Sequence, residues 1–206
     1  MTASNGLAVK FADIDRLDFR GEIKIGSNTF IDVNVIFEGE VNIGKNCFIG
    51  AGSIIKDSVI QDGVVVEPNS LIENSLIGSL CKIGPFAHIG PEAKLESKVE
   101  IGNFVEVKRS KIGKNTKAKH LAYIGDGEIG ESVNIGAGTI FVNYDGKKKS
   151  KTKVGSGAFI GSNSSLVETL KIGKNSMIGA GSVVTKDVPE NKLALGRSRQ
   201  RNIKRK

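Results

Sequence analysis

A six-residue repeat runs through most of this chain and constrains its fold more than any other feature. Ile-Gly or Val-Gly dipeptides occur 15 times, and an apolar residue recurs at every sixth position in runs such as residues 25–55 and 59–107. A period of six fits neither an α-helix nor a simple alternating strand. It fits a solenoid of very short strands, in which each hexad supplies one inward side chain and one turn, and each coil stacks on the next.

The repeat therefore predicts an all-β fold, a parallel β-helix with three hexads per coil. The period alone does not give handedness, and we expect a left-handed parallel β-helix from what is known of hexapeptide coils. We expect this domain over residues 23–190, in roughly nine coils, after a lead-in over residues 1–22 and before a basic tail over residues 191–206. Ile and Val suit an extended, half-buried backbone. Hexapeptide coils are known to wind left-handed, against the right-handed rule for ordinary crossovers.

One interruption of the repeat stands out. The step from Phe141 to Val154 is thirteen residues, two hexads plus one, and it contains Asn143, Tyr144 and five lysines between residues 147 and 153. Insertions in a solenoid become protruding loops, often on the binding face. We therefore expect a short protruding loop near residues 143–153.

Positive charge is concentrated in two segments. The 206 residues carry a formal net charge of +8, but the last fifteen hold seven basic side chains and no acidic one, which leaves +1 for residues 1–191. The tail and the lysines of residues 147–153 fit either solvated surface segments or the capture of a small anionic ligand. A nucleic-acid surface would need interleaved aromatic residues or a known reading module, so we expect no nucleic-acid partner, with binding by the tail as a minor alternative.

Composition excludes several other classes. No stretch approaches the roughly 20 apolar residues of a membrane span, and the first fifteen residues lack the apolar run of a secretory signal. Cys47 and Cys81 form neither a disulfide framework nor a metal motif, which favours a reduced, cytoplasmic compartment. Two histidines, His88 and His120, are too few for a zinc site of the γ-carbonic-anhydrase type, so we expect no metal. Acid–base chemistry from one histidine remains.

Two sequence blocks are more specific than the hexads. One runs His-Leu-Ala-Tyr-Ile-Gly-Asp from His120, and the other runs Asn-Ile-Gly-Ala-Gly-Thr from Asn134, followed by Asn-Tyr-Asp-Gly from Asn143. With GSNSSLV and MIGAGSVVTKDVPENKLALGRSRQ, they resemble the acetyltransferase domain of a bacterial bifunctional enzyme family. That family joins glucosamine-1-phosphate acetyltransferase to N-acetylglucosamine-1-phosphate uridylyltransferase. The nucleotidyl-transfer domain is absent here, so we expect either part of a longer protein or a single-domain relative.

The resemblance implies a homotrimer with active sites at subunit junctions and acetyl-CoA as co-substrate. It implies N-acetylation of glucosamine-1-phosphate in UDP-N-acetylglucosamine biosynthesis, with no permanently bound cofactor. By position, His120 matches the family's catalytic base and Glu106 the carboxylate that orients it. Sugar-phosphate contacts match Lys108, Tyr123, Asn134 and Lys149. Acetyl-CoA contacts match Ala137, Asn143, Tyr144, Ser162, Ala180 and Arg197.

One position departs from the family pattern. Where the family usually places an arginine for the sugar phosphate, this chain has Gly90. Losing one charged hydrogen-bond donor costs about 1.5–3 kcal/mol of phosphate affinity. Two alternatives therefore stay open: an acetyltransferase for a different amino-sugar or hydroxyl acceptor, and a non-catalytic trimeric β-helix module.

Overall fold

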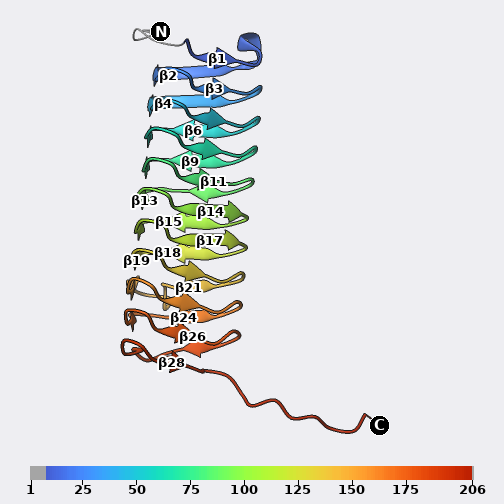
Figure 1. Ribbon diagram of the computed structural model, residues 1–206, viewed down its shortest axis with the longest axis vertical. Helices are drawn as coiled ribbons and strands as arrows, with labels where there is room; N and C mark the ends of the chain where they lie inside the picture. Colours follow the sequence, from blue (N-terminus) through green and yellow to red (C-terminus); the bar gives the residue numbers. More distant parts are fainter. Residues whose placement is uncertain (1–7, 206) are drawn as a thin grey trace.

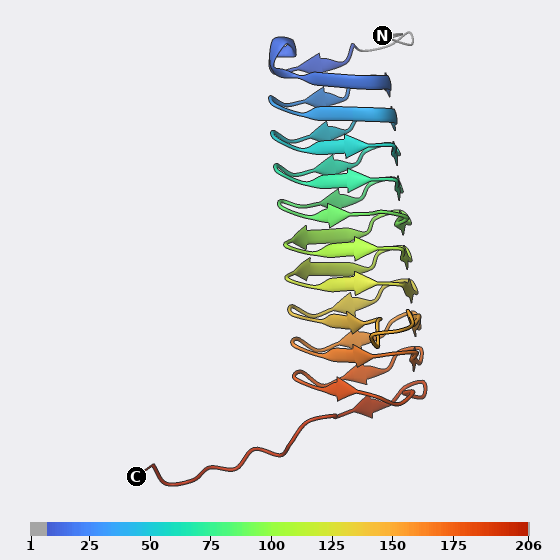
Figure 2. The same ribbon diagram turned by 180° about the vertical axis from the view of Figure 1, so that it is seen from behind.

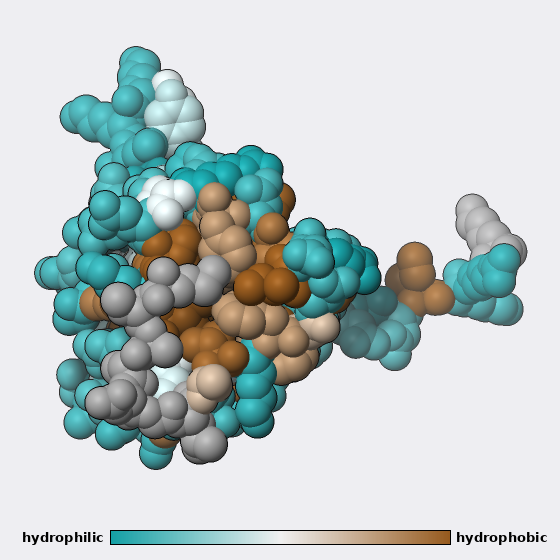
Figure 3. Space-filling model, turned by 90° about the horizontal axis from the view of Figure 1, so that it is seen from above, coloured by the Kyte–Doolittle hydropathy of each residue, from teal (hydrophilic) through white to brown (hydrophobic). Residues whose placement is uncertain are grey.

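The computed structural model describes residues 8–205, which form a column of stacked short strands (Figure 1). Residues 1–7 of the expected lead-in, and Lys206 of the tail, lie outside the described residues. Each strand pairs in parallel with strands in the neighbouring coils, as in β10 (Leu76–Ile77) against β13 (Lys94–Leu95). The chain is the left-handed parallel β-helix that we expect from its hexapeptide coils. Seen along its axis, the column has an apolar centre and a hydrophilic rim (Figure 3).

The coils have three faces. The first face is an 11-stranded sheet: β1 (Lys10–Phe11), β3 (Phe30–Ile31), β5 (Phe48–Ile49), β8 (Val65–Val66), β11 (Lys82–Ile83), β14 (Glu100–Asn103), β17 (Lys117–His120), β20 (Asn134–Ile135), β23 (Phe159–Ile160), β26 (Met177–Ile178) and β28 (Leu193–Ala194). The second face contains β6 (Ile54–Lys56), β9 (Leu71–Glu73), β12 (His88–Ile89), β15 (Glu106–Lys108), β18 (Tyr123–Gly125), β21 (Ile140–Val142), β24 (Ser165–Val167) and β27 (Val183–Val184). The third face contains β7 (Val59–Ile60), β10, β13, β16 (Lys111–Ile112), β19 (Gly127–Ile129), β22 (Thr152–Val154) and β25 (Lys171–Ile172).

Two longer strands join the second and third faces. β2 (Asp18–Ile25) and β4 (Ile36–Ile43) pair along their full length, and β4 then pairs with both β6 and β7. A single turn of 3-10 helix, η1 (Ile14–Arg16), precedes them. Among the described residues, no helix is long and apolar enough to cross a membrane.

The stack extends beyond the six-residue repeat at both ends. β1 pairs with β3, so stacking already begins within the segment expected as a lead-in, and β28 pairs with β26 in the segment expected as a tail. These flanking strands make the column slightly longer than the nine coils predicted from the repeat. The residues after β28 run away from the column as an extended segment (Figures 1 and 2).

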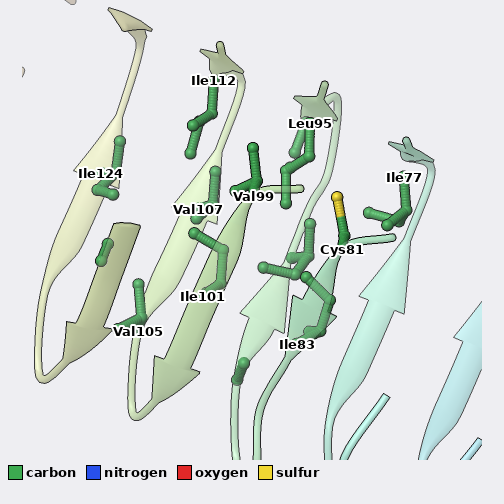
Figure 4. Packing of buried hydrophobic residues seen from close by; sticks show 14 of the residues in the cluster. Ile77, Cys81, Ile83, Leu95, Val99, Ile101, Val105, Val107, Ile112 and Ile124 are labelled. Carbon is green, nitrogen blue, oxygen red and sulfur yellow. The ribbon is translucent and has the colours of Figure 1, made fainter. Parts of the chain in front are cut away.

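The inward residue of each hexad forms the core. Ile83 and Ile101 are buried almost completely and point into the column one coil apart on the first face, and Val107 points into it from the second face (Figure 4). A second inward position, two residues earlier, holds smaller side chains such as Cys81 and Val99. Burying this aliphatic column supplies the main stabilisation of the coils, at about 25 cal/mol per Å² of apolar surface.

One corner of the column carries large apolar residues in an unfavourable backbone conformation. Phe86, Phe104 and Leu121 have φ of 54°, 56° and 49°, whereas Asn69 fills this corner one coil earlier with φ of 58°. The left-handed region suits Asn and is costly for bulky side chains. Phe86 and Phe104 stack with ring centroids 5.4 Å apart, and the three residues are 50%, 56% and 60% exposed. We call Phe86, Phe104 and Leu121 the apolar ridge.

Candidate active site

His120 ends β17, immediately before the apolar ridge residue Leu121. It lies in register with Asn103 of the preceding coil, and its Nδ1 is 2.8 Å from Asn103 Oδ1. An amide oxygen can only accept a hydrogen bond, so Nδ1 carries the proton and donates it. The exposed Nε2 of His120 therefore keeps a lone pair and can act as a base.

A strip of small residues continues the column of His120 toward the C-terminus. Ala137, Ser162 and Ala180 occupy the same corner position in the next three coils. The backbone hydrogen bonds between successive coils at this corner establish that order. We call these three residues the small-residue strip. Arg197 lies beyond its last member, with its Cδ 3.9 Å from the point where a Cβ of Gly181 would stand. The structure thus brings four of the predicted acetyl-CoA contacts into one line that starts at His120.

A second group of predicted site residues lies at the other edge of the second face. Lys108 is in register with Gly125 at the end of β18, where Tyr123 begins the strand. Asn143 donates from Nδ2 to Tyr123 Oη at 3.4 Å. Tyr144 and Lys149 pair with each other across the insertion of residues 143–153, which stands out from the column in Figure 2. The predicted protruding loop is therefore adjacent to this second group.

The remaining predicted residues lie on two different faces. Asn134 begins β20 on the first face, in register with Lys117 and Phe159. Glu106 begins β15 on the second face, in register with Tyr123. The hydrogen bond that orients His120 here is accepted by Asn103 Oδ1, so the orienting role of Glu106 stays a prediction.

Within one chain, the two groups of site residues are separated by the width of the second face. His120 and the small-residue strip lie at the corner where the chain enters this face. Lys108, Asn143 and the insertion lie at or beyond the corner where the chain leaves it. Among residues 8–205, no three His, Cys, Asp or Glu side chains come together in a way that could hold a metal ion.

Comparisons with known proteins identify the family. The profile described as "GMPPB C-terminal domain" matches residues 19–90, and "Bacterial transferase hexapeptide (six repeats)" matches residues 151–186. The chain is 49% identical over 195 residues to the bifunctional protein GlmU of Pseudoalteromonas atlantica, covering 95% of this chain and 43% of that protein. It is 50% identical over 192 residues to GlmU of Acinetobacter baylyi, covering 93% and 42%. The chain belongs to the hexapeptide-repeat transferases.

The chain spans less than half the length of these curated relatives. Among solved structures, the UDP-N-acetylglucosamine acyltransferase of Francisella novicida aligns with a TM-score of 0.55 and 17% identity. That alignment covers 88% of this chain and 65% of the other, and at this identity it supports the fold alone. The similarity to GlmU confirms the resemblance predicted from the His120 and Asn134 blocks.

Gly90 is required by this hexapeptide-repeat backbone. Its φ is +125°, and a Cβ there would stand 2.0 Å from the carbonyl oxygen of Glu73. Beside it, His88 Nε2 lies 3.0 Å from Glu73 Oε1. An arginine at position 90 would therefore displace the neighbouring coil, so Gly90→Arg cannot serve as a clean test of phosphate binding.

The lysines of the insertion divide into two sets. Lys151 and Lys153 pair with the two carboxylate oxygens of Glu128 at 3.1 and 3.0 Å, and their hydrogen bonds lower the pKa of that carboxyl group. They tie the end of the insertion to the third face. Lys149 contributes its charge near Asp126, where it helps to lower the pKa of that carboxyl group.

Three residues of the site were missed by the sequence reasoning: Asn103, Arg109 and Asp126. A signal for them exists in the spacing. Asn103 is seventeen residues before His120, and Arg109, Asp126 and Asn143 follow one another at intervals of seventeen. Residues one coil apart lie side by side in a solenoid, so counting back seventeen residues from His120 and Asn143 finds them once the strand register has given that coil length.

Proposed function

We propose that the chain transfers the acetyl group of acetyl-CoA to the amine of glucosamine-1-phosphate, giving N-acetylglucosamine-1-phosphate. The proposal is supported by the similarity to GlmU over 95% of the chain. The observation that carries it is the position of His120, a histidine with an available Nε2, at the head of a small-residue strip that ends beside Arg197.

The small-residue strip suits an extended thioester. Ala137, Ser162 and Ala180 present little side-chain volume, so a flexible arm can lie against the backbone of successive coils. Stacked strands are about 4.8 Å apart, so the three steps from His120 to Ala180 span roughly 14 Å. Arg197, beyond the strip, would hold a coenzyme phosphate through its guanidinium group.

His120 supplies the acid–base chemistry in this proposal. Its Nε2 removes a proton from the acceptor amine, whose nitrogen then attacks the thioester carbon. The carbon–sulfur bond breaks, the acetyl group stays on nitrogen as an amide, and coenzyme A leaves as the thiol after protonation. The oxygen that becomes negative needs a preset donor. The N–H groups of Gly136 and Gly138 already bond to neighbouring coils, so the N–H of Ala137 between them is the candidate.

A homotrimer would complete the site. Lys108, Tyr123 and Lys149 would bind the sugar phosphate, with Asn134 as a further sugar contact, and Asn143 and Tyr144 would contact acetyl-CoA. In one chain Lys108, Asn143 and the insertion lie across the second face from His120, so a junction between subunits would bring the two groups together. The exposed apolar ridge supports such association, because it leaves two phenylalanines and a leucine in solvent in the single chain.

The second candidate is an acetyltransferase for a different amino-sugar or hydroxyl acceptor. It is favoured by Gly90, which offers no charge where the family usually has arginine, and by the neighbouring Glu73, whose carboxylate would repel a phosphate. An acceptor panel with thiol release as the readout would separate the candidates. A preference for a non-phosphorylated sugar would favour the second. Acetyl-CoA binding with no acceptor-dependent thiol release would favour the non-catalytic module.

The direct test is His120→Ala assayed with glucosamine-1-phosphate and acetyl-CoA. We expect turnover to fall by about 10²–10⁴ with the fold and oligomeric state intact, because a general base contributes that much to proton transfer. Circular dichroism and light scattering check the fold and the mass. Near-normal turnover in this variant would contradict the assignment of His120.

A further inference from the structure

A polar network outside the predicted site joins three successive coils at the start of the insertion. Arg109 donates from Nε to Asp126 Oδ1 at 2.8 Å and from Nη2 to Asp126 Oδ2 at 2.9 Å. Asp126 Oδ2 also accepts a hydrogen bond from Asn143 Nδ2. Arg109 and Asp126 are therefore tied to Asn143, the first residue of the insertion.

This network is better shielded than the other ion pairs of the column. The side chains of Arg109 and Asp126 are 22% and 14% exposed, whereas those of Lys56 and Glu38, an ion pair between earlier coils, are 38% and 39% exposed. A two-point guanidinium–carboxylate pair has a fixed geometry and is stronger than a single contact. The hydrogen bond from Arg109 lowers the pKa of Asp126, with smaller contributions from Asn143 and Lys149.

Gly125 leaves the space that the network needs. A Cβ at this position would lie 2.5 Å from both Asn143 Nδ2 and Tyr123 Oη. The phenol of Tyr123 and the amide of Asn143 thus lie over the bare backbone of Gly125. Arg109 and Asp126 fix the amide of Asn143, and this amide contacts the phenol of Tyr123. The Arg109–Asp126 pair therefore positions two residues predicted to contact ligands, although neither Arg109 nor Asp126 is itself predicted to contact one.

The insertion is held at both ends. Asn143 is held by Asp126 at its start, and Lys151 and Lys153 are held by Glu128 at its end. Between these anchors, Asp145 accepts from the backbone N–H groups of Lys147 and Lys148 and closes the turn. The Glu128 anchor is formed by two exposed lysines, so the shielded Arg109–Asp126 pair is the more rigid of the two.

We propose that Arg109 and Asp126 are positioning residues that hold Asn143, and with it the insertion of residues 143–153, in the conformation that acceptor binding requires. This inference rests on the proposed function for its kinetic consequence, but its structural consequence stands independently. Loss of the pair frees the start of the insertion. Tyr144 and Lys149, which the insertion carries, then lose their fixed position relative to Tyr123 and Lys108.

Limited proteolysis tests the structural consequence without any assay of activity. Trypsin cleaves after lysine, and Lys147, Lys148 and Lys149 follow one another in the insertion. We expect Arg109→Ala to raise the rate of cleavage there about tenfold, because cleavage tracks the population of the open loop. Arg109→Lys, which keeps the charge but loses the two-point geometry, should fall between Arg109→Ala and the parent. Lys56→Ala, which breaks an ion pair between earlier coils, is the matched control and should cleave at the parent rate.

Kinetics test the functional consequence. For Arg109→Ala and Asp126→Asn we expect the acceptor KM to rise about tenfold while kcat falls less, because binding geometry is lost and His120 is untouched. Gly125→Ala should act in the same direction, since its methyl group displaces Asn143 and Tyr123 with the pair intact; it also keeps the proposal testable if Arg109→Ala fails to fold. The proposal would be overturned if these variants showed a rate of loop cleavage and an acceptor KM that both lie within about twofold of the values for Lys56→Ala. If the parent itself releases no thiol, the proposed function has failed, and the cleavage rates alone decide the role of the pair.

Discussion

The tautomer of His120 depends on its neighbour in the preceding coil. The amide oxygen of Asn103 accepts from Nδ1 at 2.8 Å and thereby fixes the tautomer that leaves Nε2 basic. A histidine at an exposed corner would otherwise rotate and exchange tautomers. The base in the proposed reaction is therefore a pair of residues from two coils.

Replacing Asn103 with alanine tests this dependence. We expect kcat to fall about tenfold, less than for His120→Ala, because the base remains but is no longer oriented. The KM for acetyl-CoA should change little, since Asn103 is not on the small-residue strip. Steady-state thiol release provides both constants. Asn42→Ala, a polar change on β4 far from the site, is the control, and equal kcat for the two variants would contradict the role of Asn103.

Both cysteines are protected by the column. Burial raises the pKa of the Cys47 thiol, and it raises that of Cys81 to about 11. At pH 8 only about one part in a thousand of Cys81 would be thiolate, the reactive form. We expect no labelling of either cysteine by an aromatic disulfide reagent in the native protein at pH 8, and two labelled thiols per chain in denaturant. The reagent can thus follow coenzyme A release without a protein background, and rapid native labelling would contradict the buried position.

The residues that the sequence reasoning missed show where its limit lies. The resemblance located His120 and the small-residue strip, but it did not reveal Asn103. A strict repeat of three hexads gives eighteen residues per coil, and counting back eighteen from His120 reaches Gly102. The coils around the site are one residue shorter, because a deletion at a corner is absorbed by the turn. Neighbours across coils therefore required the register of the strands, which the hexads alone did not determine.

At the scale of the strand, alternation determines which side chain supports the fold. β8 contains two valines, of which Val66 is fully buried and Val65 is only partly buried on the outer surface. The hexad run of residues 59–107 predicts Val65 as the inward residue of this strand, and that prediction is wrong. The buried positions are Ile60, Val66 and Ile72, one residue later than the run, and a step of five from Ile72 to Ile77 restores the expected register. Adjacent apolar residues such as Val65 and Val66 hide this one-residue shift in the sequence.

The two valines of β8 offer a matched pair. We expect Val66→Ala to lower the free energy of unfolding by about 1–2.5 kcal/mol, through lost burial and the cavity that remains. Val65→Ala should cost roughly 0.5 kcal/mol or less, since its side chain faces outward. Urea denaturation followed by circular dichroism measures both. Equal losses would show that inward and outward positions are not distinguished in this strand.

At the scale of the whole molecule, the apolar ridge is the feature that a single chain does not explain. Three large side chains occupy left-handed corner positions in consecutive coils, and at least half of each side chain is exposed. Such a cost in backbone strain and solvent exposure is typical of a surface that is covered in the assembled protein. The subunit junction proposed for the two groups of site residues would be one way to cover it.

Phe104→Asn tests the ridge without straining the corner, because Asn69 adopts the same conformation at this corner two coils earlier. We expect the mass in solution to fall from three chains to one and the thiol release to fall with it. Light scattering measures the mass. Leu80→Asn is the control, since Leu80 is also exposed and left-handed but lies at a different corner. A trimer that survives Phe104→Asn would exclude the ridge from the interface.

The last coils of the column have a free end, and each coil is held only by its neighbours. A stack of this kind unfolds locally from its ends, and each coil has its own free energy of local unfolding. The residues proposed for the coenzyme are spread over consecutive coils from Ala137 to Arg197. A bound coenzyme would therefore contact several of the last coils at once and stabilise them against local unfolding. Hydrogen exchange should slow most in β26 and β28, the strands nearest that end. Coenzyme binding and the folding of the last coils would then be thermodynamically coupled, so that each favours the other.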